Sequence, residues 1–405
     1  MTQALARFLA IHSADELASQ MLNVAIGWRL YSVTHSPMSL AYAGLAQFLP
    51  NAAAALVAGH AADRLERRKV IGWSLLAQFS CLAIFTFWTS VTAPAAAPVY
   101  LLLLVMGAAR AFGSPTMSAT LPNIVSSSDF PRAVASDSSA FQICTIAGPA
   151  VGGLLYAIGG RLAFAAAAGL YLFAMTQAWR LPAGGRREIP ADRSMLAGIR
   201  YVRSNRLLLS LLSLDLFAVL LGGVTALLPI YAKDILAAGP IGLGCLRCAP
   251  GVGAAIVGLV LARRPVKRGA GKSMLLCVAG FGLATVVFAV STAFWLSLGA
   301  LIAAGGFDMV SMVIRQTLVQ VSTPDAMRGR VSAVQWMFVG ASSELGEFES
   351  GATAALFGTV PAALLGGLGT LAVVALWTKL FPELRSADKL VADSHAANCS
   401  SPPQG

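Results

Sequence analysis

The sequence predicts an all-α membrane protein with twelve transmembrane helices in two parallel six-helix repeats, and three observations support this fold class. Of its 405 residues, 57% are hydrophobic and 12% are charged, whereas soluble domains carry roughly 25% charged residues. Most of its basic residues lie in alternate gaps between long apolar runs. A segment of the first half, Gly44–Arg64, recurs in weaker form 200 positions later.

The transmembrane helices are predicted from apolar runs of the length that a bilayer requires, about 20 residues. Twelve runs satisfy this requirement, although the first and the eleventh hold several charges. The predicted spans are residues 8–33, 39–61, 70–91, 98–122, 132–158, 162–179, 207–232, 241–262, 274–291, 294–319, 331–358 and 361–381.

The longest polar gap follows the sixth span and divides the spans six and six. We therefore expect an N-terminal six-helix bundle at residues 1–179, a cytoplasmic linker at 180–206 and a C-terminal six-helix bundle at 207–381. A short surface helix is expected within the linker at 195–202. The polar residues 382–405 are expected to form a disordered cytoplasmic tail.

The basic residues predict which side of the membrane each gap faces. When the gaps are assigned to alternate sides, 23 of the 29 Lys and Arg residues fall on one side. The other side receives Arg161 and Lys233, and four arginines lie within spans. The basic side is the cytoplasm under the positive-inside rule. We therefore expect an integral protein of a bacterial-type inner membrane with both termini in the cytoplasm.

Two internal matches indicate a duplication. Gly44–Arg64 aligns without gaps to Gly244–Arg264 with seven identities in 21 positions. An Asp-x-x-Arg motif precedes the fifth span at Asp129 and the eleventh span at Asp325. Parallel repeats of this kind enclose a cavity at their interface in known membrane proteins.

The segment between the second and third spans, Gly59–Lys69, carries the most specific motif. Its sequence GHAADRLERRK resembles the major facilitator superfamily signature Gly-x-x-x-Asp-Arg-x-Gly-Arg-Lys. The matching residues are Gly59, Asp63, Arg64, Arg67 and Arg68. Glu66 stands where the signature has its second glycine.

Three further segments, residues 27–50, 110–153 and 323–333, resemble the exporter branch that includes enterobactin exporters and macrolide-efflux proteins. A motif in the second of these is similar to the fifth-helix motif of proton antiporters; its residues are Gly148, Pro149, Gly152 and Gly153. The resemblance implies the major facilitator fold. It also implies a secondary transporter that works by alternating access and couples protons to the efflux of small amphiphilic compounds of drug or siderophore type.

Two other functions remain open, an importer or facilitator of a small polar metabolite and a membrane sensor that transports nothing. The sequence contains no nucleophile elbow, phosphate-binding loop or metal-ligand spacing. Neither an enzyme nor a metal or other cofactor is therefore expected. The expected partners are a small-molecule substrate, protons and the lipid bilayer, without nucleic acid, and the protein is expected to be a monomer.

Ionisable residues inside the spans are the candidates for the transport chemistry, because a charge that faces lipid at mid-depth costs about 2.5–3.5 kcal/mol. In the first span, either Asp15 or Glu16 is expected to carry protons, with an ion pair to a neighbouring span as the alternative. Gln20 and Asn23 fall roughly on the same side of this helix as Asp15. We expect this polar stripe to line a cavity.

Arg110 and a pair of glutamates complete the proton-coupling candidates. Arg110 is twelve residues into its span, too deep to reach either surface, so a buried pairing with a carboxylate is expected. The resemblance adds a role in proton coupling for an arginine at this depth. Glu344 and Glu347 share a helix face, and two close carboxylates cannot both ionise cheaply in a low dielectric. One could hold a proton, or the pair could bind a cationic cargo; a wet outer vestibule or a pairing with Arg247 is the alternative.

Four other intramembrane charges are assigned by depth. Asp308 and Arg315 of the tenth span are cavity candidates. We expect each of them to contact another span and not each other. Asp137 and Asp215 lie close to the cytoplasmic ends of their spans, so we expect them to line the mouth of a cavity or to pair. No role is assigned to His12.

Gly59, Asp63, Arg64 and Arg68 of the signature segment are expected to form a conformational gate. In the implied fold, Asp63 lies near the N-terminus of the eleventh helix, where the helix dipole favours a carboxylate. A contact made in one state only would bias the protein toward that state, here the outward-facing one. The alternative is that the basic residues of this segment only set the topology.

Overall fold

The computed structural model describes residues 3–64, 66–91, 96–126, 128–182, 195–264 and 269–386, and all regular structure within these ranges is helical. The helices of the first half are α1 (Gln3–Thr34), α2 (Pro37–Arg64), α3 (Arg67–Val91), α4 (Ala97–Ile124), α5 (Phe130–Ile158) and α6 (Gly160–Ala178). The long helices of the second half are α8 (Arg206–Gly222), α10 (Gly239–Arg263), α11 (Ala270–Val290), α12 (Phe294–Val321), α13 (Asp325–Phe357) and α14 (Thr359–Leu380). Shorter helices are α7 (Met195–Ser204), α9 (Leu228–Ile230) and α15 (Pro382–Ser386).

The all-helical membrane fold is confirmed. The described part of the chain has a long helical segment at each of the twelve predicted spans. Eight of these segments are long and apolar enough by themselves to cross a membrane. The segments outside that group, α1, α2, α6 and α13, include the two that carry several acidic residues, α1 and α13.

The seventh span differs from the single helix predicted at 207–232. Helix α8 ends at Gly222, and a 3₁₀ turn (Thr225–Leu227), α9 and a π-helical turn (Tyr231–Ile235) follow it. The glycine at the end of α8 allows α14 to approach closely, because a Cβ at Gly222 would lie 2.6 Å from Oγ1 of Thr370. The hydroxyl of Ser350 donates a 2.7 Å hydrogen bond to the carbonyl oxygen of Gly223. A broken helix is tolerated at this depth when neighbouring helices satisfy the freed backbone groups in this way.

The surface helix predicted at 195–202 is present as α7. It packs on α13 so closely that a Cβ at Gly198 would lie 2.8 Å from the backbone oxygen of Arg330. Beyond the last span, residues 382–386 form α15. There Glu383 forms an ion pair with Arg206 at the start of α8, with Nη1 of Arg206 3.1 Å from Oε1 of Glu383. The rest of the predicted tail, 387–405, lies outside the described residues.

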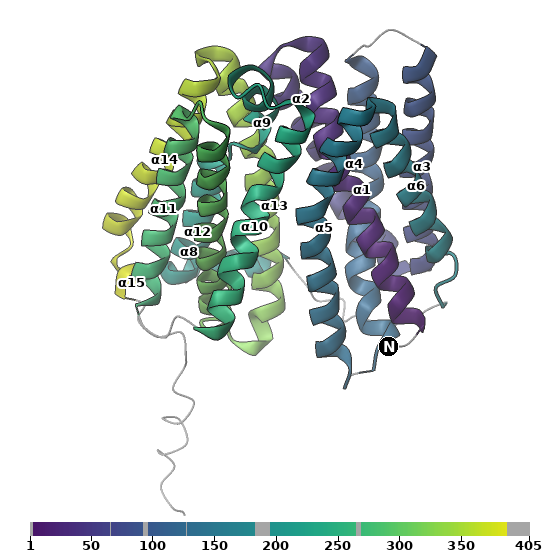
Figure 1. Cartoon of the computed structure of the whole chain (residues 1–405). Coiled ribbons are helices and arrows are strands. Elements are labelled where there is room, and N and C mark those ends of the chain that lie inside the picture. The colour runs from purple at the N-terminus through teal and green to yellow at the C-terminus, as the bar shows by residue number, and fades with distance from the viewer. Residues whose placement is uncertain are drawn as a thin grey trace, which may run out of the picture.

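The helices form two groups, α1–α6 and α8–α14, that meet along two seams, α5 with α10 and α2 with α13 (Figure 1). We call the end of the bundle where α1 begins and α14 ends the terminal face, and the other end the opposite face. A Cβ at Gly153 of α5 would lie 2.5 Å from the backbone oxygen of Pro240, and one at Gly351 of α13 would lie 2.8 Å from Cβ of Ala41. Both contacts are close to the opposite face. The ribbons of α5 and α10 separate toward the terminal face (Figure 1).

Candidate functional site

Two cavities adjoin each other: the near cavity is walled by α1–α5 and, from the second half, by Glu344 of α13, and the far cavity lies between the two groups of helices. The near cavity, of about 410 Å³, is lined by residues toward the terminal face, among them His12 and Asp15 of α1 and Ser118 of α4. The far cavity, of about 250 Å³, is lined by residues toward the opposite face, among them Asn23 of α1 and Ala226 of the broken seventh span. The residues that line both cavities are Glu16, Gln47, Arg110 and Glu344. These four side chains come from α1, α2, α4 and α13, so the junction of the cavities is built by both halves of the chain.

The two acids of α1 have different surroundings. Oε1 of Glu16 accepts hydrogen bonds from Nε2 of Gln20 at 2.7 Å and from Oγ1 of Thr145 of α5 at 3.3 Å. Asp15 lines the near cavity, and its Oδ1 atom is buried without a hydrogen-bond partner among the described residues. Asp15 is therefore the acid of this pair with an unused acceptor at the cavity wall.

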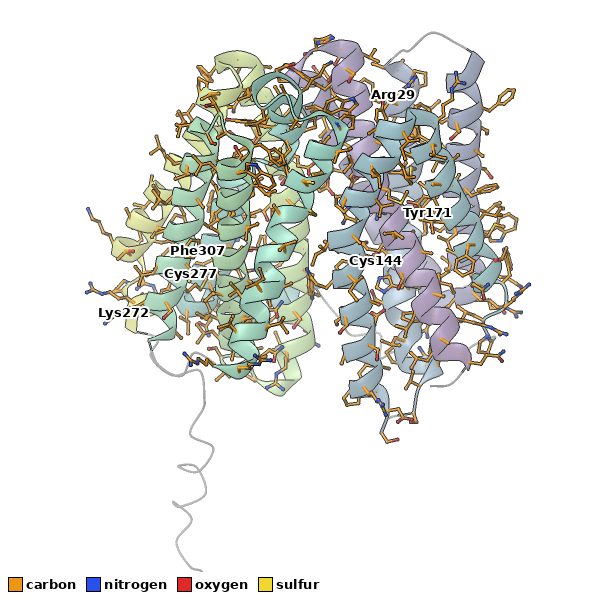
Figure 2. The ribbon with its side chains drawn as sticks, viewed as in Figure 1. Arg29, Cys144, Tyr171, Lys272, Cys277 and Phe307 are labelled. Carbon is orange, nitrogen blue, oxygen red and sulfur yellow. The ribbon has the colours of Figure 1, made fainter. Side chains whose placement is uncertain are left out.

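Arg110 supplies a positive charge where the cavities join. Its guanidinium interacts electrostatically with Asp15, Glu16 and Glu344 rather than with a single carboxylate. The phenol of Tyr171 lies beside it, fully buried and without a hydrogen-bond partner in the described structure. Figure 2 shows Tyr171 at mid-height in the first group of helices. One cation is thus shared among three carboxylates, so protonation of any of them changes the charge balance around it.

The glutamate pair of α13 spans the junction and the far cavity. Glu344 lines both cavities, whereas Glu347 lines the far cavity together with Arg247 of α10. Helix α2 passes close to this pair, because a Cβ at Gly44 would lie 3.5 Å from Cβ and Oε2 of Glu347. Glu347 and Arg247 interact electrostatically, the pairing given above as an alternative role for Glu347.

The predicted cavity residues fall into two groups. Gln20 and Asn23 line the far cavity, as the polar stripe of the first span predicts. Asp308 and Arg315 line neither cavity. Arg315 of α12 forms an ion pair with Asp215 of α8, and their side chains are 5% and 9% exposed. Asp308, two turns away on the same helix, is exposed and lies outside this pair.

The fifth-helix motif makes close contacts on two sides of α5. A Cβ at Gly148 would lie 2.5 Å from Cβ of Gln20, and one at Gly152 would lie 2.7 Å from the backbone of Met21. On the other side, a Cβ at Gly244 of α10 would lie 2.6 Å from the backbone oxygen of Pro149. The motif therefore lets α5 approach the candidate proton-binding helix α1 and the seam with the second half at once.

The predicted gate is only partly described. Helix α2 continues through Gly59 and Asp63 to Arg64, but the side chains of these residues lie outside the described part of the structure. Glu66 pairs with Arg68 and, at 2.9 Å, with Nζ of Lys69. The hydrogen bond from Lys69 and the nearby charge of Arg68 hold the pKa of the Glu66 carboxyl below its usual range. The gate function of this segment stays a prediction.

The structure adds site residues that the sequence did not single out. Nδ1 of His12 lies 2.7 Å from Oδ1 of Asp137, so the expected partner of Asp137 is a histidine of α1. Gln47 of α2 and Gln78 of α3 also line the near cavity. The two glutamines interrupt apolar runs, which is a signal that a search for polar residues inside spans would have found.

The comparisons with known proteins agree with this architecture. Residues 2–403 match a family model described as transmembrane secretion effector. The chain is 29% identical over 396 residues to the enterobactin exporter EntS of Escherichia coli O139:H28 (strain E24377A / ETEC), which covers 94% of this chain and 91% of the exporter.

Solved transporter structures share the fold. A bacterial homologue of the human lysosomal transporter Spinster, in an inward-facing and unoccupied conformation, superposes with a TM-score of 0.73 at 12% identity and covers 95% of this chain and 96% of that one. A bacterial homologue of the iron transporter ferroportin in an inward-facing state gives a TM-score of 0.72 at 16% identity, with coverage of 95% and 100%. At these identities the similarity shows the fold alone.

Proposed function

Because the chain belongs to the transmembrane secretion effector family of the major facilitator superfamily, we propose that this membrane transporter is a proton-coupled exporter of small amphiphilic compounds. The observation that carries the proposal is the junction of the two cavities. There Glu16, Arg110 and Glu344 come together from both halves of the chain, with Asp15 beside them. Its relatives and structural neighbours are transporters, and the chain is not an enzyme.

The proposed orientation follows the distribution of basic residues. The terminal face lies on the cytoplasmic side of a bacterial-type inner membrane. Cargo therefore enters the protein through the near cavity. The halves at 1–179 and 207–381 then rock against each other, and the seam near Gly153 and Gly351 opens in the outward-facing state. Contacts between the halves near the opposite face support an inward-facing assignment for the present conformation.

The near cavity has the composition that an amphiphilic cargo requires. Its apolar wall includes Ile71, Leu75, Met117 and Phe141, and its charged groups are Arg110, Glu344 and the α1 acids. Pockets of this kind bind the body of a ligand by apolar contact and orient it with a few polar groups. The export of enterobactin by a relative of 29% identity supports a cargo of the siderophore type.

Protons would drive the cycle through the charge balance at Arg110. In the outward-facing state, protons enter the far cavity and bind Glu344 or Glu347, or pass on to Asp15 or Glu16. A protonated carboxyl attracts the guanidinium less, so the relative free energies of the two conformations change and cargo is released outward. The protons leave toward the cytoplasm when the near cavity opens again.

The test uses purified protein reconstituted into oriented vesicles with an imposed pH gradient, and enterobactin and ethidium as probes. Glu344→Gln should abolish pH-driven transport, because the amide cannot take up a proton. The matched control is Glu349→Gln on the same helix; Glu349 accepts a 2.8 Å hydrogen bond from Thr353 and lines neither cavity. Full activity of Glu344→Gln would exclude this residue as an essential proton carrier.

An importer or facilitator of a polar metabolite is the second candidate. It is favoured by the polar character of the far cavity, whose lining includes Gln20, Asn23, Gln47 and Arg247. The two functions differ in direction. Net movement of a probe toward the terminal face would favour the importer. A transport rate that does not depend on the pH gradient would favour the facilitator.

A further inference from the structure

The hydrogen bond between His12 and Asp137 lies at the boundary between the near cavity and a smaller side cavity. Nδ1 of His12 and Oδ1 of Asp137 are 2.7 Å apart, and the side chains are 26% and 19% exposed. A carboxylate can only accept, so the imidazole donates its Nδ1 proton. His12 lines the near cavity, and both residues line a side cavity of about 210 Å³ among α1, α4 and α5.

The order of the ionisable groups follows the depth of the membrane. Asp15 is three residues farther along α1 than His12, which places it about 4.5 Å deeper and on the same helix face. Asp137 is seven residues from the first residue of α5, and His12 is nine from the first residue of α1. Both helices begin at the terminal face. The spatial order Asp15, His12, Asp137 therefore leads from the junction of the cavities toward that face.

The charges around the imidazole suit a proton carrier. Asp137 of α5 and Asp15 and Glu16 of α1 interact with His12, and all three are acids. From the other helices that wall the near cavity, Arg110 of α4 and Glu344 of α13 are the charged groups that line it among the described residues. Phe8 and Phe141 flank the ring at centroid distances of 6.0 and 5.7 Å. Imidazole exchanges protons near neutral pH and has a nitrogen for each side.

We propose that His12 and Asp137 form the path by which protons leave Asp15 for the terminal face, an inference that rests on the proton coupling proposed above. The carboxyl proton of Asp15 passes, directly or through one water molecule, to the lone pair of Nε2, which leaves a carboxylate and an imidazolium. The imidazolium gives its Nδ1 proton to Asp137, and the Asp137 carboxyl releases it to solvent through the side cavity. One proton enters and one leaves, and no electrons are exchanged. The neutral ring is left with its proton on Nε2 and returns to the Nδ1–H tautomer by exchanging protons with water of the near cavity.

The experiment measures coupled fluxes in vesicles that contain the purified full-length protein and a pH-sensitive dye, with enterobactin and ethidium as probes. His12→Ala should slow both proton and probe flux by roughly ten-fold or more without changing probe affinity or Tm. Imidazole added to the compartment at the terminal face should restore flux, because a free base can occupy the vacated site. Asp137→Asn should slow flux as well. Combining it with His12→Ala should add little, since both changes interrupt one path.

Matched controls separate this role from general effects of the substitutions. His35→Ala changes an exposed histidine near the opposite face, and Asp129→Asn changes an exposed acid at the start of α5. Both should leave flux unchanged, and His35→Ala should be insensitive to imidazole. The relay is wrong if His12→Ala keeps wild-type coupled flux, or if its loss of flux is not restored by imidazole. A lowered Tm with no rescue would identify the pair as a strut between α1 and α5.

The two proposals fail in different ways. If the wild-type protein moves neither probe against a proton gradient, the proposed exporter function fails and the relay fails with it. If the wild-type protein couples protons to probe movement while His12→Ala and Asp137→Asn behave like it, only the relay is wrong.

Discussion

Two sets of opposite charges lie inside the membrane region, and the two differ in their surroundings. In the first set, Asp15, Glu16 and Glu344 surround Arg110 on the walls of open cavities. In the second, Asp215 and Arg315 pair between α8 and α12 and are almost fully buried. The same residue types thus form one group on the walls of cavities and one that is closed off.

The difference indicates what each set does. A sealed pair in a low dielectric is compensated only while both partners are present, because each charge alone would be buried without a counter-charge. A cluster with an excess of acids beside a cavity can gain or lose a proton without leaving such a charge. We therefore interpret Asp215–Arg315 as a structural link inside the second half and the Arg110 cluster as the part of the molecule that changes charge.

The largest expected effect comes from breaking the sealed pair. Asp215→Asn leaves the Arg315 guanidinium buried without its carboxylate, and removing one partner of a buried pair costs about 3–5 kcal/mol. The variant should show a much lower Tm in detergent and a lower yield of folded protein. Asp308→Asn, which changes an exposed acid of the same helix as Arg315, should leave the Tm nearly unchanged.

A double variant sharpens the comparison. Replacing both partners with apolar residues, Asp215→Leu with Arg315→Met, should recover most of the lost Tm, because no unpaired charge then remains. Glu344→Gln should behave in the opposite manner, with a wild-type Tm and no pH-driven transport. A large loss of stability in Glu344→Gln would contradict the distinction between a structural and a functional set of charges.

The helix positions of these charges follow from the sequence, but their partners do not. Twelve spans could be predicted because a bilayer demands about 20 apolar residues for each helix, and the acids of α1 and α13 stood out against those runs. The break after Gly222 escaped prediction because hydropathy is the same for a continuous helix and for a broken one. That break forms part of the far-cavity wall, at Ala226.

Which charged group an intramembrane residue pairs with depends on two things. These are the rotation of its helix about the helix axis and the depth of the charges on the neighbouring helices. Asp308 and Arg315 are seven residues apart and so lie on one face of α12, yet Arg315 is buried against Asp215 and Asp308 is exposed. The two residues differ by about 10 Å in depth at 1.5 Å per residue, and Arg315 is the one that lies at the level of Asp215. The His12–Asp137 contact was missed for the same reason, since one sequence holds no information on which spans adjoin at equal depth.

The next effect concerns the seam between the halves rather than the charges. Gly153→Ala places a methyl group about 2.5 Å from the backbone oxygen of Pro240, and overpacking of this kind costs about 1–3 kcal/mol. The cost applies only while α5 and α10 touch near the opposite face, so the variant should shift the population toward the state that is open there. Fold and Tm should change less than in Asp215→Asn.

Distances between spin labels at Ser138 of α5 and Val260 of α10, both exposed, would report this shift in a background without native cysteines. The labelled sites lie toward the terminal face and should come closer together in Gly153→Ala. Gly169→Ala on α6 is the matched control, since a Cβ there would meet nothing within 4 Å. An unchanged distance distribution would argue against a seam that opens during transport.

The smallest expected effect belongs to the surface charges of the signature segment at Glu66, Arg68 and Lys69, which are not sealed and line neither the near nor the far cavity. Glu66 joins Arg68 and Lys69 at the end of the bundle, where solvent screening makes such pairs weak. The pKa of Glu66 is lowered in the folded protein, so its contribution to stability is present above the ordinary glutamate pKa and is lost as the pH falls through the lowered value. The small Tm difference between wild type and Glu66→Gln should therefore shrink on acidification, and transport at neutral pH should be unchanged. A clear loss of transport in Glu66→Gln with an unaltered Tm would instead place this segment with the Arg110 cluster, among the charges that act in the cycle, and would support the predicted gate.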